Sequence, residues 1–151
     1  MSVSLLLIPL AVATVAAVRG ATAGRDDQGR VVCQVQTRMR DETLLAAALA
    51  DTRAEVAVAA DEITAEWQGV RASFRRDPEG IWLAHFTGEV DEERAVEIVR
   101  AIDVAYGRQV QRAVLDRLRE RAPAAGLRLE SEQVTDDAAV RLVFAVEGGR
   151  R

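Results

Sequence analysis

Hydrophobic and polar residues alternate with a period of two in several segments after residue 30, and this period is typical of strands. Over residues 31–39 the alternation places Cys33 and Val35 on one face and Gln34 on the other. Further segments with this pattern are predicted as strands: 55–60, 70–75, 81–88, 127–134 and 139–146. Residues 61–68 also alternate, and the sequence leaves open whether they form another strand.

Two other segments show the three- and four-residue spacing of an amphipathic helix. The first begins after Asp41, which occupies the position of an N-cap residue, and has a stripe made of Leu44, Leu45, Ala48 and Leu49. The second begins with the acidic residues 91–93, which favour a helix N-terminus, and ends before Pro123. Its stripe consists of Val99, Ile102, Tyr106, Val110, Val114 and Leu118. Gly107 interrupts this helix, so a bend or a break is expected there.

The order of these elements is strand, helix, two or three strands, long helix and two strands, which predicts an α+β fold. We expect a two-layer sandwich in which a mainly antiparallel sheet carries the short and the long helix on one face. This domain should span residues 31–147, with a tail at 148–151. Residues 20–30 are rich in glycine and charge and predict a flexible linker.

Residues 1–19 are predicted as an apolar N-terminal helix, because residues 2–18 contain no charged side chain. A helix of this length would measure about 26 Å, slightly less than the ~30 Å of a bilayer core. An uncleaved membrane anchor is the leading interpretation, while a cleaved signal peptide and a helix packed on protein stay open. The residues expected in the membrane are Leu5, Leu6, Leu7, Ile8, Leu10, Val12, Val15 and Val18.

Positive charges follow this apolar run instead of preceding it, at Arg19, Arg25 and Arg30. The positive-inside rule then places the domain on the cytoplasmic side of the membrane. The small residues Ala21 and Ala23 offer a cleavage site, so a secreted domain is the alternative. A soluble cytoplasmic protein follows if the helix packs on protein.

The charge balance is slightly acidic, with 24 Asp and Glu against 20 Lys and Arg, and the net charge is −4. A nucleic-acid binder usually carries a basic excess, so no nucleic-acid partner is expected. All of the basic residues are arginine, which is typical of a bacterial genome rich in G and C. The single cysteine, Cys33, excludes an intrachain disulfide and lies in an apolar alternation, where a buried thiol is expected.

We find no set of residues in the sequence that points to catalysis, a metal or a cofactor. The chain has no glycine-rich phosphate loop and no Cys/His spacing for zinc. His85 is the only histidine and lies in a predicted strand, where a structural or surface role is expected. The acidic pairs, such as 61–62 and 136–137, fall at turns or helix starts, where acids are common. We therefore expect a non-enzymatic protein without a cofactor.

The candidates for a partner-binding surface are Trp67, Trp82, Arg108 and Arg112. Tryptophan and arginine are enriched among the residues that dominate the energy of protein interfaces. Core packing is the alternative for the two tryptophans. A salt-bridged solvent face, with Arg112 paired to Asp116, is the alternative for the arginines.

Short motifs follow one another in a defined order from residue 31 onward. They are Glu42–Leu49 after the first strand, Ala72–Arg76 in the hairpin, Ala105-Tyr106 in the long helix, and Gly126-Leu127, Glu130, Glu132, Asp136-Asp137 and Val140–Val143 near the end. This order, over residues 31–146, resembles the family called hypothetical chloroplast reading frame thirty-five, found in plastids, cyanobacteria and other bacteria. Family members lack an apolar leader and carry a Gly-aromatic pair where this chain has Asp51-Thr52-Arg53.

The resemblance implies no established activity. Bacterial relatives accompany ATPases of the MoxR type, which implies an accessory or adaptor role. We therefore expect a membrane-associated accessory protein whose domain binds a protein partner, either such an ATPase or further copies of the chain as a homo-oligomer. The alternative is a small-molecule-binding or sensing module with a pocket near Trp67 or Trp82. An enzyme that uses His85 and the acidic pairs is the third hypothesis.

Overall fold

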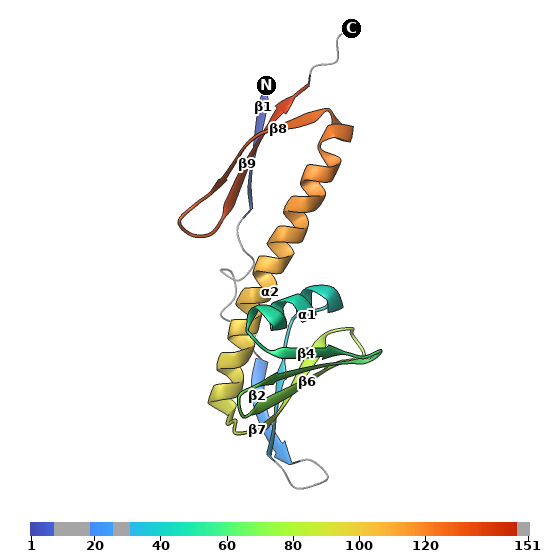
Figure 1. The fold of residues 1–151 in the computed structure, drawn as a ribbon, viewed down its shortest axis with the longest axis vertical. Helices are drawn as coiled ribbons and strands as arrows, with labels where there is room; N and C mark the ends of the chain where they lie inside the picture. Colours follow the sequence, from blue (N-terminus) through green and yellow to red (C-terminus); the bar gives the residue numbers. More distant parts are fainter. Residues whose placement is uncertain (8–18, 26–30, 148–151) are drawn as a thin grey trace. The chain divides into compact units, whose positions relative to one another are not determined.

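The fold of this chain belongs to the α+β class, with two antiparallel sheets and two α-helices among the residues that the structure describes. The structure is a computed structural model, and the residues it describes are 1–7, 19–25 and 31–147 (Figure 1). The α+β class expected from the order of the elements is therefore confirmed.

The chain divides into two compact units, each with its own sheet. The larger unit covers residues 13–106, and the smaller unit combines residues 1–12 with 107–151. The sequence predicts one domain over residues 31–147. The period of a strand indicates that it pairs but not with which strand, so the division into two sheets cannot be seen in the sequence.

The larger unit contains a six-stranded sheet in the order β2-β3-β7-β6-β5-β4, in which every neighbouring pair is antiparallel. Its strands are β2 (Arg19–Arg25), β3 (Val31–Gln36), β4 (Glu55–Val58), β5 (Glu62–Trp67), β6 (Val70–Arg76) and β7 (Trp82–Gly88). The segment 61–68, which the sequence left open, thus supplies β5 between β4 and β6.

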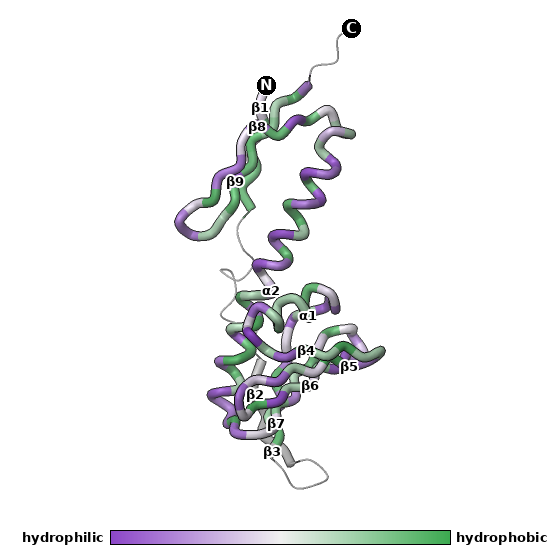
Figure 2. Tube along the Cα trace, in the orientation of Figure 1, coloured by the Kyte–Doolittle hydropathy of each residue, from purple (hydrophilic) through white to green (hydrophobic). Residues whose placement is uncertain are grey.

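One face of this sheet packs against α1 (Glu42–Asp51) and against the residues of α2 (Glu92–Arg121) that precede Gly107. The alternating strand residues on that face and the apolar stripes of both helices form one buried cluster. Its largest members are Trp82, Phe74, Phe86, Met39, Leu45, Leu49, Ile63, Ile102, Val35 and Val99. Figure 2 shows hydrophobic and hydrophilic residues following one another along α2, as expected for an amphipathic helix.

Local polar contacts fix the ends of both helices. The Asp41 carboxylate accepts a hydrogen bond from the N–H of Leu44 at 2.9 Å, and the Asp91 carboxylate accepts one from the N–H of Arg94 at 2.8 Å. Such N-caps each contribute about 1 kcal/mol. The helix α2 runs through Gly107 to Arg121, so the break expected at this glycine does not occur.

The smaller unit contains a three-stranded antiparallel sheet in the order β1-β9-β8. Its strands are β1 (Ser2–Leu7), β8 (Leu127–Val134) and β9 (Val140–Val146). Leu142 and Phe144 of β9 are buried and pack against Leu115 of α2. The side-chain amide of Gln111 in α2 donates to the carbonyl of Leu7 at 3.1 Å, which ties the end of β1 to this helix.

The N-terminal residues differ from the expectation. Ser2–Leu7 form a strand paired with β9, so the apolar helix predicted over residues 1–19 is wrong for this part. An uncharged apolar run fits a helix and a strand equally well, and the partner strand lies at the far end of the chain. Residues 8–18 lie outside the described residues. Residues 19–25, largely part of the expected linker, form β2 against β3.

Candidate functional site

The second face of the six-stranded sheet carries the polar side chains of β4, β5, β6 and β7. These side chains point away from the buried cluster because successive residues of a strand point to opposite faces. They are exposed or half-buried, so no described helix covers this part of the sheet. We call this surface the polar face and define it by Glu55, Ala57, Glu62, Thr64, Glu66, Arg71, Ser73, Arg75 and His85.

A row of small and neutral polar side chains crosses the middle of the polar face. The strand registers place Ala57 opposite Thr64, Thr64 opposite Ser73 and Ser73 opposite His85. The Thr64 hydroxyl donates to the carbonyl of Ala57 at 3.5 Å. This row therefore offers hydroxyl and imidazole groups without a formal charge when His85 is neutral.

An ion pair lies on each side of this row. Nη2 of Arg71 lies 2.8 Å from Oε2 of Glu66, and Nε of Arg75 lies 3.0 Å from Oε1 of Glu62. The hydrogen bond to Glu66 raises the pKa of the Arg71 guanidinium, which stays charged throughout the physiological range. Both pairs join neighbouring residues of β5 and β6. Within each pair, the guanidinium and the carboxylate largely neutralise each other's charge.

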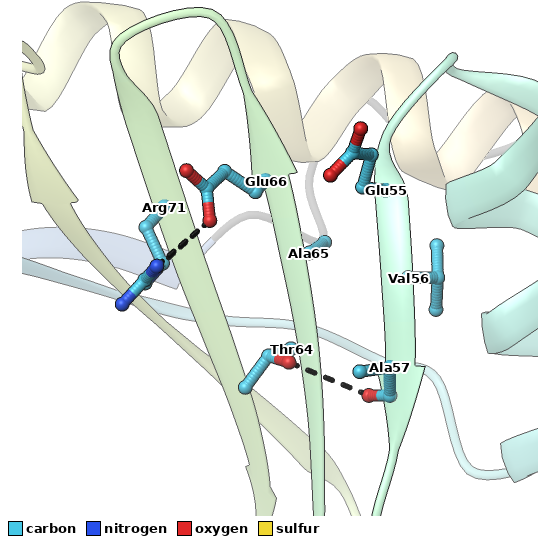
Figure 3. A pocket seen from close by; sticks show the side chains of 7 residues that line it. All are labelled: Glu55, Val56, Ala57, Thr64, Ala65, Glu66 and Arg71. Carbon is cyan, nitrogen blue, oxygen red and sulfur yellow. Dashed lines mark hydrogen bonds and ion pairs between the residues drawn. The ribbon is translucent and has the colours of Figure 1, made fainter.

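An open depression of about 440 Å³ lies at the β4 end of the polar face (Figure 3). The strand register places Glu55 directly opposite Glu66, and Arg71 pairs with Glu66 on its other side. The lining thus holds two carboxylates and one guanidinium, which leaves an excess of one negative charge. Neither Trp67 nor Trp82 lines this depression, although the sequence predicts a pocket near one of them.

His85 is the only titratable group in the central row. Burial lowers the pKa of its imidazole, the positive charge of Arg75 lowers it further, and contacts with Ser73 and Glu62 partly oppose this. Its Nδ1 atom is buried and has no hydrogen-bond partner among the described residues. The imidazole is therefore neutral at pH 7 and presents no charge on the polar face.

Cys33 lies on the opposite, helix-covered face of the sheet and is 1% exposed. Burial raises the pKa of its thiol, and the negative charges of Glu92 and Asp91 add to this. A protonated, buried thiol is a poor nucleophile. The structure therefore places Cys33 in the core, as the alternation of residues 31–39 predicts.

The described residues contain no group of three or more His, Cys, Asp or Glu side chains that could hold a metal ion. The acidic pairs noted in the sequence serve local structure where the structure describes their contacts. Asp91 caps α2, and the Asp137 carboxylate accepts a hydrogen bond from the Thr135 hydroxyl at 2.5 Å in the β8–β9 turn. This hydrogen bond lowers the pKa of Asp137.

The two tryptophans proposed for a partner surface lie in or against the core. Trp82 is 1% exposed, and the guanidinium of Arg76 lies 4.8 Å above its ring. Trp67 is half-buried, packs against the same cluster, and donates its indole N–H to the Thr52 hydroxyl at 3.2 Å. Trp82 therefore packs in the core, which was the alternative for this residue, and it is not accessible to a partner.

The two arginines proposed for that surface, Arg108 and Arg112, are exposed on α2. The expected pair between Arg112 and Asp116 is not formed, and Asp116 pairs instead with Arg119 at 2.7 Å. Arg119 also contacts Glu132 of β8 at 2.6 Å, and the hydrogen bond to this residue raises the pKa of the guanidinium. Arg119 thus bridges two carboxylates, that of Asp116 three residues earlier on the same helix and that of Glu132 on β8.

The residues proposed for a membrane anchor divide between β1 and the part of the chain outside the described residues. Leu5, Leu6 and Leu7 lie in β1, whereas Ile8, Leu10, Val12, Val15 and Val18 lie outside the described residues. Arg19 and Arg25, proposed to set the topology, begin and end β2, and Arg30 lies outside the described residues. In the described part of the chain, we find no helix with the length and apolar character needed to cross a bilayer.

Comparison of the chain with protein-family models, with curated proteins and with solved structures gives no match.

The polar face is only partly visible in the amino-acid sequence. Arg71, Ser73 and Arg75 alternate with the apolar residues of their strand. Their partners Glu62 and Glu66 belong to the segment whose structure the sequence left open. Reading residues 61–76 as a hairpin about Gly69, which has a φ of 76°, would have paired these charges.

Proposed function

We propose that this chain is a non-enzymatic accessory protein whose larger unit binds a protein partner through the polar face of its six-stranded sheet. The observation that carries the proposal is the difference between the two faces of this sheet. One face is buried by α1 and α2, while the described part of the other carries an ordered polar surface that no described helix covers.

The chemistry of the polar face fits a protein better than a small molecule. Small-molecule sites are enclosed and mostly apolar, with a few polar groups that orient the ligand. The depression beside Glu55 is open and lined in part by charged side chains. Transient protein interfaces, in contrast, are flat and about as polar as the rest of a protein surface.

The charges of this face specify the partner in part. Glu55 has no ion-pair partner among the described contacts and faces Glu66, which already pairs with Arg71. Two like charges directly opposite on neighbouring strands destabilise the pair. A basic side chain of a partner placed between the two carboxylates would relieve this repulsion, so the partner presents arginine or lysine at this point.

The resemblance to the chloroplast reading frame thirty-five family makes a MoxR-type ATPase the first named partner to test. Membrane association stays a separate prediction, because β1 takes up residues 2–7 of the expected anchor. Fractionation of cells that express the full chain would test this prediction.

Site-specific photocrosslinking tests the proposed surface. A photoreactive phenylalanine analogue replaces Ser73 at the centre of the polar face or, as the control, Arg100, which is exposed on α2 in the same unit. We expect a discrete crosslinked protein from position 73 and none from position 100. The added variant Thr64→Arg, which places a bulky cation in the central row, should lower the yield at position 73 about tenfold.

The same product from both positions, or no product from position 73 in cells, would show that the polar face is not the binding surface. Circular dichroism of each variant confirms that the change has not unfolded the protein. The crosslinked partner is identified by mass spectrometry, and a purified MoxR-type ATPase is then tested for direct binding to the wild-type chain and to Thr64→Arg.

A further inference from the structure

Strand β1 forms an edge of the three-stranded sheet in the smaller unit, and its sequence lacks the features that normally protect a sheet edge. Ser2–Leu7 contain no charged residue and no proline, and the register against β9 shows no bulge. Natural proteins usually protect an edge with lysine, proline or a bulge, because an unprotected edge pairs with other strands.

The other edge of the same sheet is protected. Strand β8 carries Arg128, Glu130 and Glu132, and its register against β9 shifts between Leu129 and Ser131. Charged side chains and a bulge both oppose the addition of a further strand. The two edges therefore differ, and among the described residues β1 is the edge of this sheet that is open to pairing.

The backbone of β1 presents its free hydrogen-bonding groups in a regular pattern. The N–H of Val146 donates to the carbonyl of Met1 at 3.0 Å, so these two residues form a hydrogen-bonded pair. In an antiparallel ladder such pairs alternate with pairs that are not hydrogen-bonded. Ser2, Ser4 and Leu6 therefore direct their N–H and C=O groups away from β9, toward the free edge.

The side chains of β1 leave an apolar strip only partly covered. Val3 and Leu5 lie opposite Phe144 and Leu142, on the face that packs against α2. Phe144 and Leu142 are 1% and 0% exposed, whereas Val3 and Leu5 are 45% and 40% exposed. The apolar core of the smaller unit thus continues to the open edge, where nothing in the described part of the chain covers it.

We propose that β1 pairs with β1 of a second copy of this chain, antiparallel across a two-fold axis that passes through Ser4. In this register Ser4 faces Ser4 of the other copy and Leu6 faces Ser2, and these are the residues whose backbone groups point to the free edge. Val3 then lies opposite Leu5 of the other copy on the helix-covered face. The two three-stranded sheets become one continuous sheet with an apolar seam.

Three properties of β1 favour a second copy of this chain as the partner that pairs with its free edge. The two-fold register matches free N–H groups with free C=O groups along the whole strand. It places apolar side chains opposite each other on the covered face, and it brings no like charges together because the strand is uncharged. A two-fold axis also gives a closed dimer instead of a filament. This pairing uses a different sheet from the polar face and does not depend on the proposed function.

Sedimentation and light scattering of the full chain test the pairing, with variants at each edge of the sheet. The substitution Ser4→Pro removes an N–H that points to the free edge and leaves the β1–β9 ladder intact. The substitution Leu5→Lys places two cations at the apolar seam. The control Val134→Lys adds the same charge on β8, where the side chain is 71% exposed.

We expect the wild-type chain and Val134→Lys to have twice the chain mass of 16.4 kDa, and both β1 variants to raise the dimer dissociation constant at least about tenfold. Near-ultraviolet circular dichroism checks that each variant is folded, and Ser4→Pro keeps the test valid if Leu5→Lys fails to fold. A wild-type chain that is monomeric at about 100 μM would overturn the proposal. So would a folded Ser4→Pro variant that dimerises like the wild type.

Discussion

Arg38 and Asp103 form a two-pronged ion pair, in which Nε of Arg38 lies 2.9 Å from Oδ1 of Asp103 and Nη2 lies 2.8 Å from Oδ2. Arg38 follows β3 and Asp103 belongs to α2, so the contact joins the helix to the sheet inside the larger unit. The two side chains are 30% and 18% exposed. Solvent therefore screens this pair less than it screens the pairs of the polar face.

The substitution Arg38→Ala should lower the free energy of unfolding by about 1–3 kcal/mol, because it removes two charge-assisted hydrogen bonds and leaves Asp103 partly buried. The matched control is Arg71→Ala, which removes a similar contact to Glu66 at side-chain exposures of 66% and 55%. That loss should be about 0–1 kcal/mol. Urea denaturation of both variants measures the difference, and equal losses would contradict the ranking.

Gly88 and Gly80 provide a second matched pair. Gly88 has a φ of 106°, and a Cβ added there would lie 2.4 Å from the Gly69 carbonyl oxygen. Gly80 has a φ of 78°, and a Cβ added there meets no atom within 4 Å. We expect Gly80→Ala to cost about 1 kcal/mol from backbone strain alone. Gly88→Ala should cost at least about 2 kcal/mol more, because the Gly69 backbone must also move.

Thermal or urea unfolding of the two glycine variants measures these costs under the same conditions. A Gly88→Ala variant as stable as Gly80→Ala would contradict this prediction, because it would mean that the backbone at Gly69 moves away from the added Cβ at little cost in free energy. The Gly88 result also bears on the polar face, because the N–H of Glu89, the next residue, donates to the Gly69 carbonyl at 2.9 Å at the end of the β5–β6 hairpin.

Most elements after residue 31 could be predicted from the sequence because their signals are local. The alternation in residues 70–75 and the stop at Pro123 each depend on neighbours a few residues away. The predicted N-cap Asp41 and the acidic residues at 91–93 are signals of the same kind, and in the structure Asp41 and Asp91 each accept a hydrogen bond at a helix start. The α+β class follows from these elements without knowledge of how the strands pair.

The pairing of strands could not be predicted in the same way. Ser2–Leu7 read as a helix because they are apolar, and their partner β9 stands at the other end of the chain. The separation of β8 and β9 into a sheet of their own depends on the same long-range pairing. The pair of Arg38 with Asp103 was hidden for a similar reason, because it requires the placement of α2 on the sheet.

The buried Cys33 thiol gives a direct test of the core of the larger unit. Burial and the nearby carboxylates raise its pKa, and its side chain is 1% exposed. A thiol reagent should therefore react with the native chain at least about 100 times more slowly than with the chain unfolded in urea. Since the chain has a single cysteine, the absorbance of the released chromophore reports this site alone. Fast labelling of the native chain would contradict the burial.

His85 should make the stability depend on pH, and the direction follows from its lowered pKa. Folding lowers the pKa of the imidazole below its ordinary value of 6.5, mainly through burial. Between these two values the unfolded chain binds more protons than the folded chain. The free energy of unfolding should therefore fall as the pH is lowered from about 7.5 through 6.5, in addition to the contributions of other groups.

The variant His85→Gln isolates this contribution because it keeps a polar side chain in the central row and cannot titrate. Urea unfolding of both proteins at about pH 7.5 and about pH 5.5 gives the change in stability for each. The wild type should lose more stability than His85→Gln over this interval. Arg75→Gln should reduce the loss, because the charge of Arg75 also lowers the pKa of His85. Equal losses in the wild type and His85→Gln would show that burial does not shift this imidazole.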